Sequence, residues 1–453
     1  MAATPRPPRV AGFTGGGVAG HLWRLGSFMA LGSVALNAAQ VGEAVFLGMV
    51  GTEALAAMGF AFPITITLFA FAGGIGTGAS SVIARAMGAG DRERGAVLAT
   101  HAQLLGFLVG VALGILGALF AADIVTALGA KGAVRDMTIA YLRVYMLGVP
   151  FFLLSIVGST LLRATGRAAS PGIVMAVGSI LQVLFCPILI FGWLGLPALG
   201  IEGAAWAYVA SRVISVWVYM IVMSRARILR RSLAGLWESW RAILHVGGPA
   251  IASGLINPVS MLIVTRLLAG HGHEVVAGFN VAARVEMLAH MILWSASSSI
   301  EPFVGQNWGG RRFDRVRSAL KITEGFCVVW GLFTFTVLAL SGEFLVSLID
   351  DNAIVVAVAV AFFLIVAPSI GGMGVMQVAI ACFNARGKPM PALTISVLRT
   401  FVFYVPLCIV GNALWGYIGI FVATAITNVV MGVAGWYWNR ASVMRFVARQ
   451  AAG

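Results

Sequence analysis

Long apolar runs alternate with short polar segments along nearly the whole chain. A helix rises ~1.5 Å per residue, so each of these runs is long enough to cross a ~30 Å hydrocarbon layer. The runs lack the strict apolar–polar alternation of membrane β-strands. We therefore predict an all-α polytopic membrane protein with twelve transmembrane helices, near residues 25–50, 55–84, 96–122, 134–162, 168–194, 203–223, 243–269, 275–304, 322–340, 353–383, 393–410 and 418–438.

The composition agrees with this pattern. Of the 453 residues, 60% are hydrophobic and 10% are charged, whereas soluble domains carry about 25% charged residues. Outside the spans, the basic residues lie in the segments that we assign to the inner side, while the outer loops hold only Lys131 and Arg135. The positive-inside rule then predicts that both termini lie in the cytoplasm. We expect the membrane to be the bacterial inner membrane. Because the net charge of +14 is spread over short clusters, we expect no nucleic-acid partner.

The second half of the chain repeats the first. Gly51 in GTEAL corresponds to Gly272 in GHEVV, and MGAGDRER and LLRATGR have counterparts in WGGRRFDR and CFNARGK. The separations 272 − 51, 309 − 88 and 387 − 166 all equal 221, which indicates a duplication. Six crossings separate the copies, so they form two six-helix lobes related by a pseudo-twofold axis along the membrane normal.

A polar stretch near the middle of the chain, SRARILRRSLAGLWESWR, mixes arginines with leucines and tryptophans. This pattern is typical of an amphipathic segment in the inner headgroup region. We predict five parts: a flexible N-terminal tail (1–20), an N-lobe (21–224), a cytoplasmic amphipathic linker (225–241), a C-lobe (242–440) and a cytoplasmic C-terminal tail (441–453).

The first apolar run contains one acid, Glu43, with Gln40 and Asn37 before it. On a helix the three polar groups share an arc of roughly 120°. A carboxylate in the middle of a membrane helix costs about 2.5–3.5 kcal/mol by insertion scales and is rarely without a role. We predict that this stripe faces the protein interior and that Glu43 gains and loses a proton. In the alternative, Glu43 stays protonated and only forms hydrogen bonds.

The motifs VGEAVFLGMVGTEALAAMG, GTGASSVIARAMGAGDRERG, ARVEMLAH and EPFVGQNWGG resemble those of the multidrug and toxic compound extrusion (MATE) transporters. The resemblance extends over nearly the whole chain and is nearer to the DinF-like prokaryotic branch. It implies two six-helix lobes and a secondary antiporter that expels cationic or amphiphilic compounds in exchange for protons or sodium ions.

The family's residues carry over unevenly. Glu43 stands where the family usually has Asp. The fifth-span positions that hold two Asn and an Asp in DinF-like members read Ser179, Gln182 and Cys186 here. The seventh-span acid of the NorM-like branch falls on Asn257, and the tenth-span acid falls near Met373. This pattern favours proton coupling over sodium coupling.

Other intramembrane residues have plainer interpretations. Arg284 and Glu286 match the family's RxE motif and are expected to form polar locks, with His290 in reach of Glu286. For the arginines within spans a packing role is expected; these are Arg143, Arg212, Arg266 and Arg399. HGHE at 271–274 lacks the geometry of a zinc motif, so we expect no metal site. The candidate cavity-lining residues are Asn37, Gln40, Ser179, Gln182, Asn257, Met261, Arg284, Glu286, Met287, Met373 and Gln377.

No nucleotide-binding loop or hydrolase motif occurs, so we expect no enzyme and no cofactor beyond the proton gradient. We predict a monomer that interacts with membrane lipid and exports organic cations or amphiphiles. Two alternatives stay open. One is a flippase for a lipid-linked glycan or another large amphiphile, and the other is a non-transporting membrane sensor or scaffold.

Overall fold

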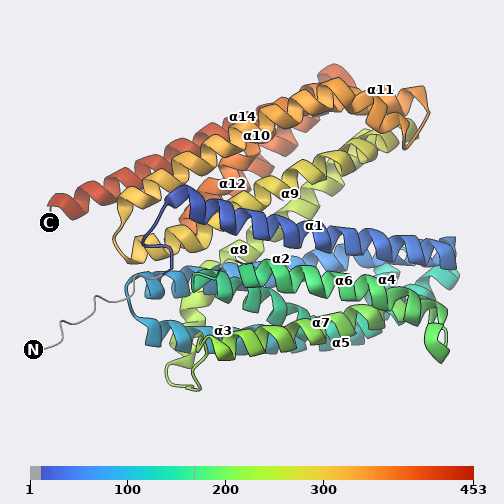
Figure 1. The fold of residues 1–453 in the computed structure, drawn as a ribbon. Helices are drawn as coiled ribbons and strands as arrows, with labels where there is room; N and C mark the ends of the chain where they lie inside the picture. Colours follow the sequence, from blue (N-terminus) through green and yellow to red (C-terminus); the bar gives the residue numbers. More distant parts are fainter. Residues whose placement is uncertain (1–11, 168, 453) are drawn as a thin grey trace, which may run out of the picture. The chain divides into compact units, whose positions relative to one another are not determined.

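The computed structural model describes residues 12–167 and 169–452, which contain helices and no strand (Figure 1). Residues 1–11 of the predicted N-terminal tail lie outside the described residues. The first half of the chain forms α1 (Val18–Val50), α2 (Thr52–Gly88), α3 (Arg92–Leu119), α4 (Ala121–Ala127), α5 (Gly132–Ala164), α6 (Ala169–Phe191), the short 3₁₀ turn η1 (Trp193–Gly195) and α7 (Gly200–Arg225).

The second half begins with α8 (Leu236–Ala269). It continues with α9 (His273–Gly309), α10 (Phe313–Ser347), α11 (Ala353–Val366), η2 (Ala367–Ser369), α12 (Ile370–Ala385), α13 (Pro389–Val397), the π-helical η3 (Leu398–Tyr404) and α14 (Val405–Ala452). The predicted all-α fold class is confirmed.

Eleven helical stretches in the described part of the chain are long and apolar enough to cross a membrane. The last, Pro389–Gln450, is 62 residues long and breaks where Trp415 and Gly416 leave the helical conformation, with φ of 59° at Gly416. A glycine is suited to this break because L side chains rarely adopt positive φ. Two crossings therefore lie in this stretch, which accounts for the predicted twelve.

The internal repeat is visible in the helix boundaries. Helices α2 and α9 are each 37 residues long, and their first residues, Thr52 and His273, differ by 273 − 52 = 221. The ends of α5 and α12 differ by 385 − 164 = 221. Gly166 and Gly387, in the turns that follow, both have positive φ. The two halves therefore fold with the same register.

The chain divides into two compact units. One contains Ser27–Ile251, and the other contains Gly16–Gly26 and the chain from Ala252 onwards. The division falls inside α8, whereas the sequence predicts a lobe boundary at residue 242. It differs because the first turns of α8 pack within the N-terminal unit, where Gly78 of α2 lies against the carbonyl of Ile243.

Helix α5 lies at the centre of the N-terminal unit and packs against α2, α3 and α7, while α7 also packs against α6. Helices α1 and α6 approach closely, since a Cβ added at Gly172 would overlap the carbonyl oxygen of Phe28. Small residues allow such contacts between membrane helices. The result is a bundle in which side chains of α1, α5, α6 and α7 meet.

Only part of the predicted amphipathic linker is helical. Residues 226–235 are non-helical, and α8 begins at Leu236. The buried ring of His101 on α3 holds this segment, with Nε2 2.8 Å from the carbonyl of Ser232 and Nδ1 2.8 Å from the hydroxyl of Ser239. The indole of Trp240 donates to the carbonyl of His101 at 3.0 Å. These contacts fix the start of α8 to the N-terminal unit.

In the C-terminal unit α12 packs against α9, α10 and α14. The core of this unit contains an aromatic cluster of Phe279, Phe362 and Phe421. Arg386, just after α12, donates to the hydroxyl of Ser442 at 2.8 Å and lies over the ring of Trp308.

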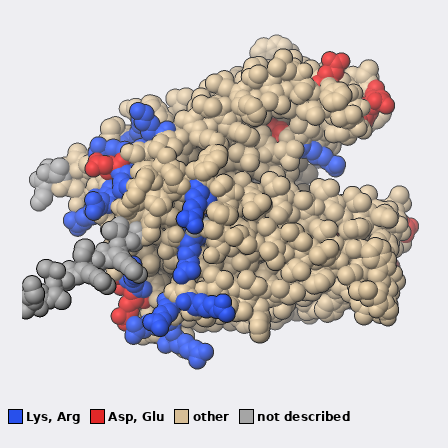
Figure 2. Space-filling view, in the orientation of Figure 1, with Lys and Arg blue, Asp and Glu red and all other residues tan. Residues whose placement is uncertain are grey.

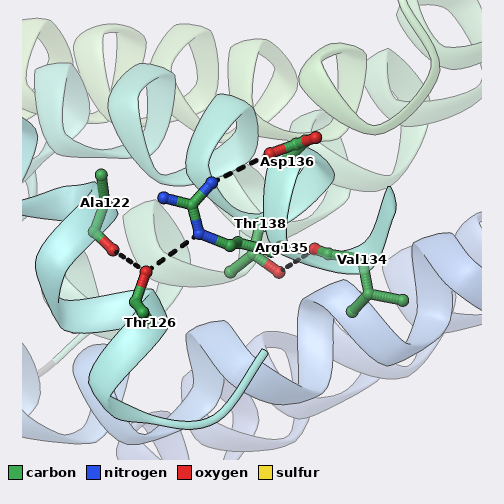
Figure 3. A network of polar contacts seen from close by, with 6 residues as sticks. All are labelled: Ala122, Thr126, Val134, Arg135, Asp136 and Thr138. Atoms are coloured by element: carbon green, nitrogen blue, oxygen red, sulfur yellow. Dashed lines mark hydrogen bonds and ion pairs between the residues drawn. The ribbon is translucent and has the colours of Figure 1, made fainter. Parts of the chain in front are cut away.

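Charged side chains gather at the ends of the helices. Within the N-terminal unit, Figure 2 shows Lys and Arg concentrated at the end that holds the α2–α3 turn and residues 226–235. At the α4–α5 turn, Arg135 donates to the hydroxyl of Thr126 at 2.9 Å and pairs with Asp136 at 3.2 Å (Figure 3). One of the two basic residues of the predicted outer loops is thus paired with an acid.

Candidate functional site

A cavity of about 130 Å³ lies inside the N-terminal unit, where α1, α2, α5, α6 and α7 converge. Most of its lining is apolar or aromatic, as in small-molecule sites generally. The lining residues are Leu36, Gln40, Glu43, Met58, Ala61, Phe62, Thr65, Phe69, Tyr141, Tyr145, Phe152, Gln182, Tyr208 and Arg212.

Glu43 is 4% exposed, and neighbouring helices hold both of its carboxyl oxygens. The hydroxyl of Tyr141 on α5 donates to Oε1 at 3.0 Å. The amide nitrogen of Gln182 on α6 donates to Oε2 at 2.9 Å. Two donors at one carboxyl group suit its ionised form, because a carboxylate can only accept hydrogen bonds. The first helix of the chain is thereby joined to two others through one acid.

Arg212 on α7 extends this network by one residue. Its Nη2 donates to Oε1 of Gln182 at 3.0 Å. Arginine has donors and no acceptor, so it holds the oxygen of the Gln182 amide towards itself and the nitrogen towards Glu43. The contacts form a chain from Arg212 through Gln182 to Glu43.

Three tyrosines form an aromatic ladder beside this chain. The rings of Tyr145 and Tyr208 stack with centroids 4.1 Å apart, and Tyr141 stacks on Tyr145 at 5.6 Å. The guanidinium of Arg212 lies 5.2 Å from the centroid of Tyr208, within the range of a cation–π contact. The cavity is therefore lined by mutually stacked aromatic rings next to a positive group.

Glu43 and Arg212 are the two residues with formal charges among those that line the cavity. The charge of Arg212 acts on Glu43, yet no direct ion pair joins them in the described ranges. The two charges are linked only through the neutral amide of Gln182. Buried ionisable groups in a membrane protein usually mark functional sites, because they are costly to keep there.

The structure brings together three of the polar residues predicted from sequence. Glu43, Gln40 and Gln182 all line the cavity. Asn37 and Ser179 instead donate to backbone carbonyls of their own helices, those of Ser33 and Met175, and neither lines this cavity.

The candidates from the second half lie in the C-terminal unit. His290 and Glu286 are 4.0 Å apart, the interaction expected from their spacing. Arg284, Met261 and Met287 are exposed. Met373 packs beside the cluster around Met376, and Gln377 is half-buried on α12. Asn257 belongs to α8, and its side chain lies outside the described residues.

Sequence reasoning missed the tyrosines and gave Arg212 a packing role by default, with a cavity-lining role only under the flippase alternative. A signal was present, because Tyr141 and Tyr145 on α5, and Tyr208 and Arg212 on α7, are each spaced four residues apart in apolar spans. This spacing places each pair on one helix face. In the described part of the chain no cluster of three or more His, Cys, Asp or Glu residues suited to a metal ion occurs.

Comparison with known proteins adds independent findings. The family model MatE matches residues 29–188 and residues 249–410, one block in each half of the chain. The chain is 30% identical over 413 residues to a FAD transporter of Shewanella oneidensis, covering 90% of this chain and 91% of that protein. It is 25% identical over 447 residues to the probable multidrug resistance protein YoeA of Bacillus subtilis, covering 94% of this chain and 96% of that protein.

Among solved structures, a mutant of the Vibrio cholerae MATE transporter VcmN superposes with a TM-score of 0.91. The two chains are 26% identical, and the match covers 94% of this chain and 97% of that one. A structure of VcmN in the bent form matches with a TM-score of 0.90 and 27% identity, over 94% of this chain and 97% of that one.

Proposed function

Since the chain belongs to the MatE family of multidrug and toxic compound extrusion transporters, we propose that it is a secondary antiporter that exports amphiphilic small molecules, organic cations among them, in exchange for protons by alternating access. The chain is a multi-pass membrane transporter and not an enzyme. We place both termini in the cytoplasm, as the distribution of arginines predicts.

The observation that carries the proposal is the position of Glu43 in the N-terminal unit. This acid lines the cavity, is buried and is held by donors from two other helices. Proton exchange requires a titratable group that the pathway can reach, and Glu43 is the one carboxyl group in the lining of this cavity. Multidrug names among the relatives, such as YoeA of Bacillus subtilis, support an amphiphilic substrate.

Proton and cation would compete for this cavity. With Glu43 ionised, its charge balances that of Arg212 and a cation is tolerated. When Glu43 takes up a proton, Arg212 becomes the only formal charge of the lining and repels the cation. Because each ligand weakens the binding of the other reciprocally, proton entry from outside favours release of the substrate there.

The test is efflux of a fluorescent organic cation from proteoliposomes, driven separately by a pH gradient and by a sodium gradient. We expect the pH gradient to drive flux in the wild type and the sodium gradient to have little effect. Glu43→Gln should abolish the pH-driven component. Glu43→Asp should retain much of it, because the shorter acid still titrates.

Glu53→Gln is the matched control, since Glu53 is exposed in the first turn of α2, and we expect its flux to equal that of the wild type. Unchanged pH-driven flux in Glu43→Gln would show that the coupling site lies elsewhere. Loss of flux in both Glu43→Gln and Glu53→Gln would indicate that the substitutions damage the protein generally, and would not support a coupling role for Glu43.

Export of FAD is a second candidate function. The relative from Shewanella oneidensis is named a FAD transporter, and Arg212 in the lining of the cavity supplies a positive group for a phosphate. Proteoliposomes loaded with FAD and with the organic cation, assayed in parallel, distinguish the two. FAD efflux above that of protein-free liposomes supports this candidate, and cation efflux without FAD efflux excludes it.

A further inference from the structure

The state of Glu43 determines the net charge of the N-terminal cavity. With Glu43 ionised the lining carries one negative and one positive formal charge, and with Glu43 protonated only the charge of Arg212 is left. Arg212 is 4% exposed and has no direct carboxylate partner among the described residues. Its Nε has no hydrogen-bond partner there either. A buried guanidinium is most stable when an anion accepts its hydrogen bonds.

We propose that Arg212 is an anion subsite that opens when Glu43 takes up a proton, and that it accepts the phosphate or carboxylate of an amphiphilic ligand. The stacked rings of Tyr145 and Tyr208 form an aromatic wall beside this guanidinium. This inference rests on the proposed function in taking the cavity as a substrate site, and it adds anionic amphiphiles as a second class of substrate for that site.

The size of the cavity limits which part of the ligand enters. An engineered protein cavity of about 150 Å³ holds a benzene molecule, and this cavity measures about 130 Å³. In this conformation it therefore accepts the charged group at Arg212, and the ring system of a larger ligand stays outside it.

The other titratable groups that face Glu43 do not supply a competing charge near neutral pH. They are the hydroxyls of Tyr141 and Tyr145 on α5 and of Tyr208 on α7, and the thiol of Cys186 on α6. The lining residues from α2 contain no titratable group. Phenols and thiols are neutral at pH 7 in their unperturbed state, so Glu43 is the group that changes the charge of the cavity.

The sign of the coupling then depends on the substrate. A cation is expelled by the proton on Glu43, whereas an anion binds better with that proton present. By reciprocity, a bound anion promotes proton uptake at Glu43. Cationic and anionic substrates of one protein would thus show opposite pH dependence of binding.

Riboflavin and flavin mononucleotide (FMN) test the subsite, because they differ only in a phosphate. Binding of each is measured by flavin fluorescence with the purified full-length chain in detergent, at pH 8.5, where the phosphate (second pKa about 6) is fully ionised. The measured quantity is the ratio of the two affinities. We expect a modest FMN preference in the wild type and an about tenfold larger preference in Glu43→Gln, which mimics the protonated acid.

Arg212→Gln should bring the ratio to about one, also when combined with Glu43→Gln, while Arg212→Lys should retain part of the preference. Arg143→Gln is the matched control, because Arg143 is exposed on α5 and its loss changes the net charge equally. Size-exclusion profiles establish that each variant is folded.

An equal ratio in the wild type and Arg212→Gln would overturn the subsite, and so would the absence of binding by both flavins. If Glu43→Gln and the wild type show the same ratio of affinities, the subsite does not depend on the protonation of Glu43. These outcomes are independent of the flux assay. Loss of proton-driven export with an intact FMN preference would refute the proposed function alone.

Discussion

The carboxyl group of Glu43 accepts a hydrogen bond of 2.9 Å from the side-chain amide of Gln182. The amide cannot turn over without losing the bond that Arg212 makes to its oxygen. Gln182 is therefore held as a donor to Glu43. A proton taken up by Glu43 finds its acceptor at the hydroxyl of Tyr141, since a hydroxyl can both donate and accept.

Gln182→Leu should be strongly destabilising as well as inactive. The change leaves Oε2 of Glu43 and Nη2 of Arg212 without their partner, and each unsatisfied buried group costs about 1–3 kcal/mol. Thermal unfolding in detergent and pH-driven flux are the measurements. Ser179→Ala, on the same helix, is the control, since the hydroxyl of Ser179 donates to the carbonyl of Met175 within its own helix. Equal stability of the two variants would contradict the network.

Tyr141→Phe should shift the pH profile of flux. The ring still stacks on Tyr145, but the donor to Oε1 of Glu43 is lost. That donor stabilises the ionised carboxyl group more than the neutral one, so its removal favours the protonated form. The midpoint of the flux profile should therefore move to higher pH by about one pH unit. Tyr145→Phe should move it less, and an unchanged or lower midpoint in Tyr141→Phe would argue against this role.

His101→Leu should release the segment that precedes α8. The variant loses the contacts of both ring nitrogens, to Ser239 and Ser232. Trypsin should then cut residues 226–235, which contain Arg230 and Arg231, faster than in the wild type. His245→Leu is the control because His245 is exposed. Equal cleavage rates in all three proteins would show that His101 does not hold the segment.

Gly172→Ala should weaken the packing of α1 on α6. The added methyl group overlaps the carbonyl of Phe28, and overpacking of this kind costs about 1–3 kcal/mol. Gly48→Ala, on α1, should be neutral or slightly stabilising, because no atom lies within 4 Å of the added carbon. The measurement is thermal unfolding of the two variants. A melting temperature of Gly172→Ala at or above that of Gly48→Ala would refute the close approach of α1 and α6.

Sequence patterns predicted most of the helices, because apolar runs and paired glycine turns are local features. Their ends were less well predicted. The predicted span 322–340 corresponds to the longer helix α10 (Phe313–Ser347). The apolar run marks only the membrane-embedded part, and the helix continues with polar residues into the headgroup region. Glu43 was found because an acid is conspicuous in an apolar span, and Gln182 was found through the resemblance to the fifth span of the family. The role of Arg212 was not predicted, because the direction of its side chain depends on how α7 packs against α5 and α6. The sequence pattern of one helix does not contain this information.

The attachment of α8 to the N-terminal unit bears on how the protein can be divided. A chain cut within residues 226–235 leaves the whole of α8 on the C-terminal fragment, although Trp240 and Ile243 have their contacts on the N-terminal fragment. Two fragments expressed separately from such a cut should therefore associate, with the first turns of α8 contributing contacts between them. A split reporter of assembly could be built at that point.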